Sequence, residues 1–188
     1  MNEVKNDLRL ELSLKAKNGL EFIISGMILW IIITIVWTMN LSGYKKGILT
    51  FMVSGLMFPM AFGLSRLLKT QWKIKDNPLH PIGVRLNIAQ LFYFPFLIFV
   101  MVKVPDYFLM TYAIITGAHL FPYGWFYNET GYSLMAGLMS VGSLVLGLYL
   151  PGNQMYLIGV SMGLSFFVLA IWLYLSYRKK ANSQNHDE

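Results

Sequence analysis

Long apolar stretches, each close to the length that crosses a lipid bilayer, constrain this chain more than any other feature. A helix needs about 20 mostly apolar residues to span the hydrocarbon core. Six stretches meet this length, at residues 22–41, 47–68, 85–104, 106–127, 132–150 and 155–177. Only short polar segments remain between them. We therefore expect an all-α integral membrane protein, built as a bundle of six transmembrane helices.

The composition argues against an ordinary soluble domain. Of the 188 residues, 56% are hydrophobic and 13% are charged, whereas soluble domains carry roughly 25% charged residues. The chain has no cysteine, which removes disulfides, thiolate metal sites and cysteine nucleophiles. The sequence also lacks a phosphate-binding glycine loop, a dinucleotide fingerprint and a paired-histidine zinc motif. We therefore expect no cofactor and no metal, and no residue is assigned a catalytic role.

Lysine and arginine are distributed unequally between the two sides of the predicted bundle. Twelve of the 15 lie before the first helix, at or between the adjoining ends of the second and third helices, or after the sixth, and three lie on the other side. Positively charged loops stay in the cytoplasm, so both termini are predicted to be cytoplasmic. The net charge of +6 is then an orientation signal. We expect the lipid bilayer, and no nucleic acid, as its partner, with a multi-pass location in a bacterial plasma membrane.

Three parts are predicted along the chain. Residues 1–19 form a cytoplasmic segment with alternating leucines, and because a strand would have no partner here, a short helix on the membrane surface fits better. Residues 20–177 form the six-helix transmembrane domain, and residues 178–188 a disordered cytoplasmic tail. Pro78 and Pro81 predict a loop between the second and third helices.

Ionisable side chains within membrane spans are costly and are often functional. The predicted topology places most polar side chains of the bundle near the cytoplasmic ends of the helices. The candidates for a substrate or proton site are His119, Tyr123, Arg66, Asn87, Gln90, Glu21, Arg85 and Glu129.

His119 is the candidate that packing explains least easily. It lies in an apolar run about two turns from the cytoplasmic end of its helix, and Tyr123 shares its face at i+4. Histidine changes its charge near neutral pH, so it could carry protons. The alternative is a histidine hydrogen-bonded to a neighbouring helix. The aromatic residues that follow, Trp125, Tyr127 and Tyr132, are predicted to form an interfacial belt.

The other candidates also have structural explanations. Arg66 and Arg85 fit long side chains that reach the lipid headgroups. Glu21 fits an acid in the first turn of a helix, where it complements the helix dipole. Asn87 and Gln90 fit interhelical hydrogen bonds, which contribute about 0.6 kcal/mol each.

The sixth predicted helix carries Gly159 and Gly163 at four-residue spacing. Small residues let two helix backbones approach closely. The pair fits packing within the chain, and it also fits a homo-oligomer formed through this glycine face.

We expect a small-solute or ion transporter, or a permeation subunit, because the polar candidates come from several different helices. The alternative is a non-catalytic membrane-protein partner, such as a regulatory, assembly or sensor subunit, that docks through the basic loop. An intramembrane enzyme using His119 and Glu129 ranks third. One continuous helix would separate these residues by about 15 Å, whereas acid–base catalysis needs both within about 3 Å of a substrate atom.

Overall fold

The computed structural model describes residues 2–187, and every regular element among them is a helix. No strand occurs within this range, so the all-α prediction is confirmed. In chain order the elements are α1 (Asn2–Lys15), η1 (Lys17–Gly19), α2 (Leu20–Thr38), α3 (Gly43–Ser54), α4 (Met57–Leu68), α5 (His80–Leu91), α6 (Phe94–Lys103), η2 (Pro105–Tyr107), α7 (Phe108–Phe126), α8 (Thr130–Tyr149), η3 (Gly152–Gln154) and α9 (Tyr156–Asp187).

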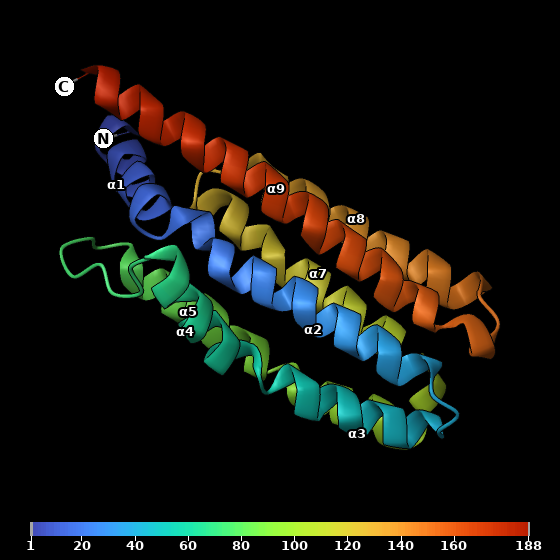
Figure 1. The fold of residues 1–188 in the computed structure, drawn as a ribbon. Helices are drawn as coiled ribbons and strands as arrows, with labels where there is room; N and C mark the ends of the chain where they lie inside the picture. The colour runs from blue at the N-terminus through green and yellow to red at the C-terminus, as the bar shows by residue number, and fades with distance from the viewer. Residues whose placement is uncertain (1, 188) are drawn as a thin grey trace.

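The chain runs back and forth along one elongated bundle (Figure 1). α2, α7, α8 and α9 each make one pass, while α3 with α4 and α5 with α6 make the other two. α7 has 19 residues and includes Pro122, and it is not among the segments that are long and apolar enough to cross a membrane. Those segments number five among the described residues: Lys17–Thr38, Gly43–Leu68, His80–Lys103, Thr130–Tyr149 and Gly152–Gln184.

Two helix pairs form the centre of the bundle, α2 with α9 and α7 with α8. Small residues let their backbones approach. A Cβ at Gly26 of α2 would come within 2.8 Å of the Phe166 ring of α9, and one at Gly117 of α7 within 2.8 Å of Met139 Cβ in α8. Buried side chains from all four helices belong to a single hydrophobic core.

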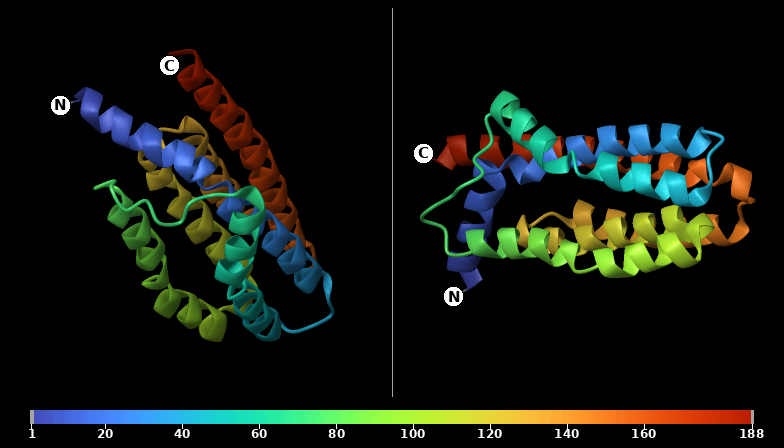
Figure 2. Two further views of the ribbon diagram at one scale, coloured as in Figure 1. Left: turned by 60° about the vertical axis from the view of Figure 1, so that its left-hand side comes forward. Right: turned by 90° about the horizontal axis from the view of Figure 1, so that it is seen from below.

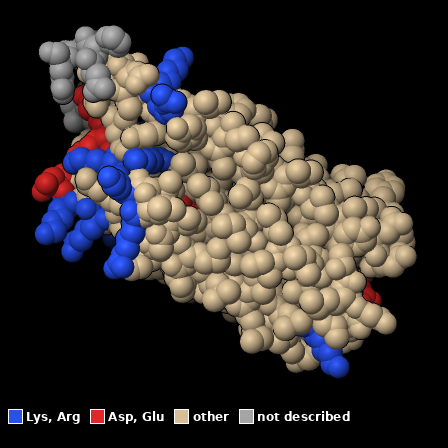
Figure 3. Space-filling view, in the orientation of Figure 1, with Lys and Arg blue, Asp and Glu red and all other residues tan. Residues whose placement is uncertain are grey.

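Charged side chains gather at one end of the bundle (Figure 3). α1, the connector of residues 69–79 and the last turns of α9 all lie there, and both termini are at this end in Figure 1. We call it the basic end. The turns after α2, α6 and α8 lie at the opposite end, which carries few charges in this view. The long apolar surface between the two ends has the length and composition of a membrane bundle.

The second and third passes overlap the spans predicted at 47–68 and 85–104, and each is interrupted near the middle, which the sequence analysis did not predict. One break lies between α3 and α4 and the other between α5 and α6. Gly55 and Leu91 lie at the breaks, four residues before Pro59 and Pro95. A proline has no N–H to donate to the carbonyl four residues earlier, and its ring crowds that carbonyl. Both passes therefore bend at these points.

The two bent passes contact each other at one end and separate at the other. Near the opposite end Phe51 of α3 packs against Phe94 and Phe108, with ring centroids 5.6 and 5.3 Å apart. Beyond the breaks α4 packs on α2, and α5 packs on α7. Figure 2 shows α4 and α5 on different sides of the bundle, joined by the connector. The breaks thus turn one packed layer into two diverging arms.

The basic end is more ordered than the sequence predicts. The connector is shorter than expected, because His80 begins α5 with Pro81 in its first turn. Asn77 fixes the connector to α1, since its amide donates to the Leu8 carbonyl and to Glu11 Oε2 over 2.8 and 2.7 Å. The tail predicted to be disordered instead continues α9 as helix to Asp187. Lys180 in this extension reaches back to the bundle, which gives the added turns a tertiary anchor.

Candidate functional site

A pocket of about 360 Å³ lies between the diverging arms, on the side of the basic end. α4 and α5 form its two flanks, and α2 and α7 lie behind them. Trp72 and Ile74 of the connector and Leu12 of α1 close it toward the basic end. Its wall is mostly aromatic and aliphatic, with a few polar side chains. A concave, mainly apolar pocket with few polar groups is the usual form of a small-molecule site.

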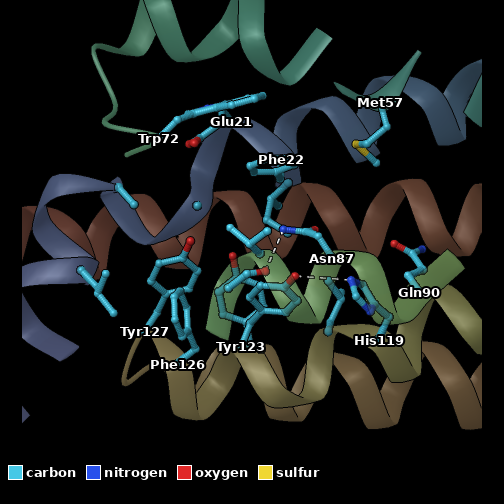
Figure 4. A pocket seen from close by; sticks show the side chains of 18 of the residues that line it. Glu21, Phe22, Met57, Trp72, Asn87, Gln90, His119, Tyr123, Phe126 and Tyr127 are labelled. Atoms are coloured by element: carbon cyan, nitrogen blue, oxygen red, sulfur yellow. Dashed lines mark hydrogen bonds between the residues drawn. The ribbon is translucent and has the colours of Figure 1, made fainter. Parts of the chain in front are cut away.

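Five of the eight candidate side chains line this pocket (Figure 4). They come from three different passes of the bundle. Glu21 is on α2, Asn87 and Gln90 are on α5, and His119 and Tyr123 are on α7. The separation of α4 from α5 leaves the space that these side chains surround.

His119 and Tyr123 interact within their own helix. The Tyr123 hydroxyl lies 3.5 Å from His119 Nε2, and the two rings meet edge to face at 5.4 Å. Pro122 lies between them without breaking α7, although it leaves the Ala118 carbonyl without its usual helical donor. Asn87 likewise donates from its amide to the Gly83 carbonyl of its own helix, over 3.1 Å. These bonds fix the direction of each side chain at the pocket wall.

Glu21 is the most unusual polar residue of the pocket. It lies in the first turn of α2, as the sequence indicates, but its side chain is only 2% exposed. Thr70 and Trp72 provide polar groups nearby, yet no hydrogen bond of normal geometry reaches Oε2. Glu21 Oε2 and Thr70 Oγ1 are the buried side-chain polar atoms that lack a partner in the described part of the chain. Buried polar groups are normally paired, so this corner of the pocket is incomplete.

Trp72 covers this corner, and sequence analysis did not single it out for the site. Its ring stacks on Phe22 of α2 with centroids 5.4 Å apart, and it meets Phe62 of α4 edge to face at 5.5 Å. His80 Nε2 lies 2.8 Å from the Trp72 carbonyl. Figure 4 shows the indole beside the Glu21 carboxylate. The sequence shows Trp72 only as a single tryptophan in a basic, proline-containing segment. That pattern is equally typical of an aromatic residue anchored at the membrane interface.

Arg66 and Arg85 do not line the pocket. Both side chains are exposed near the basic end. The Arg66 guanidinium lies 4.4 Å from the centroid of the Phe62 ring. These positions agree with long side chains that extend toward the headgroups.

Glu129 also lies outside the pocket wall, where it joins the start of α8 to α9. Lys180 Nζ lies 2.5 Å from Glu129 Oε1, and both side chains are largely buried. The Ser176 hydroxyl donates to the same oxygen, and the Asn18 amide approaches it at 3.4 Å. The structure thus places His119 at the pocket and Glu129 in a separate, ion-paired network, which gives no support to an acid–base pair.

The expected aromatic belt is only partly an interface. Trp125 is exposed, but Tyr127 and Tyr132 are 8% and 2% exposed and stack on each other with centroids 5.9 Å apart. The Tyr132 hydroxyl donates to the Asn18 carbonyl over 2.7 Å. Asn18 and Gly19 both have positive φ angles, of 57° and 71°, and so form the tight turn over which these rings pack. The two tyrosines therefore belong to the core and also line the pocket.

Within the described residues, no three His, Asp or Glu side chains come close enough together to hold a metal ion. The polar side chains of the pocket are instead one carboxylate, three amides, two imidazoles, three phenols and a threonine hydroxyl, set in an aromatic and aliphatic wall. Such a set can bind a ligand by charge, hydrogen bonds and ring contacts.

Comparison with known proteins places the chain in a family. Residues 5–176 match the model of a family of unknown function, DUF7010. Because the match covers most of the chain, the protein belongs to this family. No curated protein and no solved structure matches it.

Proposed function

We propose that this protein is a small-solute or ion transporter, or a permeation subunit, that crosses the plasma membrane six times with both termini in the cytoplasm. The gathering of basic residues at one end supports this orientation. α7 would be the sixth crossing. Its polar residues face the pocket, and it is flanked by α8 and α5, so a helix less apolar than the others can still be accommodated.

The pocket is the observation that carries the proposal. Polar side chains from α2, α5 and α7 meet in a space of about 360 Å³ inside an otherwise apolar bundle. Polar groups at membrane depth are costly and usually mark substrate or ion pathways. The incomplete pairing of Glu21 points the same way, because a bound solute would complete it.

The interrupted passes give the bundle a way to open. α4 and α5 are half-length arms that continue from α3 and α6 through proline breaks. Broken helices beside a binding site are a recurrent feature of secondary transporters. A change in the angle of either arm would widen or close the pocket toward the basic end, while the aromatic contacts at the opposite end stay in place.

Flux through a chemically blocked pocket tests the proposal. The chain has no cysteine, so Asn87→Cys places a single thiol in the pocket wall. Liposomes containing this variant are assayed with alkali ions, protons, amines, amino acids and sugars, before and after a thiol reagent. We expect uptake of at least one solute class that the reagent abolishes. Lys179→Cys, on an exposed position of α9, is the control and should keep its flux.

Absence of flux above empty liposomes for every solute would contradict the transport function. The alternative is then a regulatory, assembly or sensor subunit that docks through the exposed lysines of the connector, and purification in mild detergent should recover a stoichiometric membrane-protein partner.

A further inference from the structure

We infer that the pocket binds an organic monocation, a quaternary or protonated amine on a compact apolar body. This inference names the solute class of the proposed transporter and therefore rests on that proposed function. It stands on three observations: a buried carboxylate outside the ion pairs found among the described residues, aromatic walls, and a pocket lining without lysine or arginine.

The first observation is the buried carboxylate of Glu21. Glu21 lines the pocket, is 2% exposed, and leaves Oε2 without a hydrogen-bond partner. Lys17 is the cation whose charge acts on it, but Lys17 Nζ donates to the Leu68 carbonyl over 2.7 Å and lies over the Tyr177 ring. The ion pairs found among the described residues involve Glu11 and Glu129 instead. A buried carboxylate normally has a positive partner, and the pocket is where that partner can enter.

The aromatic wall suits the same ligand. Phe22 and Trp72 are stacked beside Glu21, and Phe58, Tyr123 and Phe126 line other parts of the pocket. The face of an aromatic ring carries partial negative charge and attracts ammonium groups within about 6 Å. Quaternary ammonium ligands are recognised in this way, by several rings and little hydrogen bonding.

Other solute classes fit the lining less well. An anion would meet the Glu21 carboxylate in a wall that contains histidines but no lysine or arginine to compensate its charge. A divalent ion such as Ca²⁺ takes 6–8 oxygen ligands, several of them usually carboxylates, and Glu21 is the one carboxylate in the wall. Asn87 and Gln90 can accept hydrogen bonds through their amide oxygens, which suits a protonated amine. A quaternary amine has no N–H to donate and would be held by the carboxylate and the rings.

Binding of three matched probes tests the inference. Benzyltrimethylammonium, neutral N,N-dimethylbenzamide and anionic benzenesulfonate are titrated calorimetrically into the protein in lipid nanodiscs, with protein-free nanodiscs as the blank. We expect the cation to bind about tenfold or more tightly than either other probe. Glu21→Gln should weaken the cation by about tenfold or more and leave the neutral probe unchanged. Asp106→Asn makes the same charge change at the opposite end and should alter neither.

A second variant keeps the test valid if Glu21→Gln folds poorly by size-exclusion chromatography. Trp72→Leu removes one ring while the carboxylate stays, and it should weaken the cation more than the neutral probe. Equal affinity for cation and neutral probe in the unaltered protein, no cation binding, or unchanged cation binding in Glu21→Gln would each overturn the inference.

Measurements of solute flux distinguish the cation-binding site from the transport function. Cation binding that depends on Glu21, without flux of any solute, would support the binding site and remove the transport function. Flux of neutral or anionic solutes that Glu21→Gln leaves unchanged would support transport and overturn the cation site.

Discussion

Gly159 of α9 lies directly against Thr34 of α2. A Cβ at position 159 would come within 2.4 Å of Thr34 Oγ1 and 3.2 Å of Thr34 Cα. The Thr34 hydroxyl donates to the Trp30 carbonyl over 2.7 Å, so it is held in this position. Gly159 is therefore used for packing within the chain. Gly163, one turn further along, would place a Cβ 3.9 Å from Ile31, and a homo-oligomer through this face stays a prediction.

Gly159→Ala should destabilise the protein by about 1–3 kcal/mol, because the added methyl overpacks the contact between α2 and α9. Thermal unfolding in detergent measures the effect. Gly137→Ala on α8 is the matched control, since a Cβ there meets nothing within 4 Å. Alanine favours helix over glycine, so this control should be neutral or stabilising. Equal melting temperatures for the two variants would contradict the close α2–α9 contact.

Lys180→Met should lower stability by about 3–5 kcal/mol, because it leaves the buried Glu129 carboxylate without its cation. Replacing both partners, as Glu129→Gln with Lys180→Met, should restore much of the loss, since no unpaired charge then remains. Lys179→Met, at the exposed neighbouring position, should have little effect. Chemical denaturation in a mild detergent compares the four proteins. A double variant no more stable than Lys180→Met would argue against the ion pair as the cause.

The anchor between α1 and the connector should weaken in acid. Hydrogen bonds from Lys15 and then Asn77 hold the pKa of Glu11 below its usual value of 4.5. A carboxyl with a lowered pKa stabilises the fold above its ordinary pKa, and this contribution is lost as the pH falls through the lower value. Protection of residues 69–79 against hydrogen exchange, corrected for the intrinsic exchange rate at each pH, should therefore fall in acid, below pH 4.5, and stay high at pH 7.

Glu11→Gln is the test variant for this prediction. It removes the titrating group, so protection of the connector should lose its pH step and be reduced already at pH 7. Asp76→Asn, a neighbouring exposed acid in the connector, keeps the Glu11 contacts and should retain the step. A step that persists in Glu11→Gln would assign it to another group.

Apolar length predicts where the chain passes through the bundle, because that signal is carried by about 20 residues at a time and tolerates single exceptions. A break within a helix, in contrast, depends on a single residue position. Pro59 and Pro95 interrupt their passes while Pro122 leaves α7 continuous, so a proline in the sequence does not decide the outcome. α7 packs extensively on α8 and also contacts α5, α6 and α9, whereas α4 and α5 each pack mainly on one neighbour, and that difference is visible only in three dimensions.

The candidate site shows the same limit. The sequence correctly predicts Glu21 in the first turn of a helix. Interaction with the helix dipole is enough to explain an acidic residue at that position. Its burial depends on the connector, since Trp72 covers it from a segment about 50 residues away. Glu129 and Lys180 are likewise joined by folding at the basic end. Pairwise contacts between distant segments leave no periodic pattern in one sequence, so these roles could not be predicted.

Removing a hinge proline should narrow the pocket. Pro95→Ala restores an N–H that can bond to the Leu91 carbonyl, which favours one straight helix through α5 and α6. With Asn87→Cys as the single thiol, we expect slower labelling by a water-soluble maleimide than in the protein that keeps Pro95. Pro81→Ala is the matched control, because a proline in the first turn of α5 removes no helical hydrogen bond. Equal labelling rates in all three backgrounds would show that the proline break at Pro95 does not hold the pocket open.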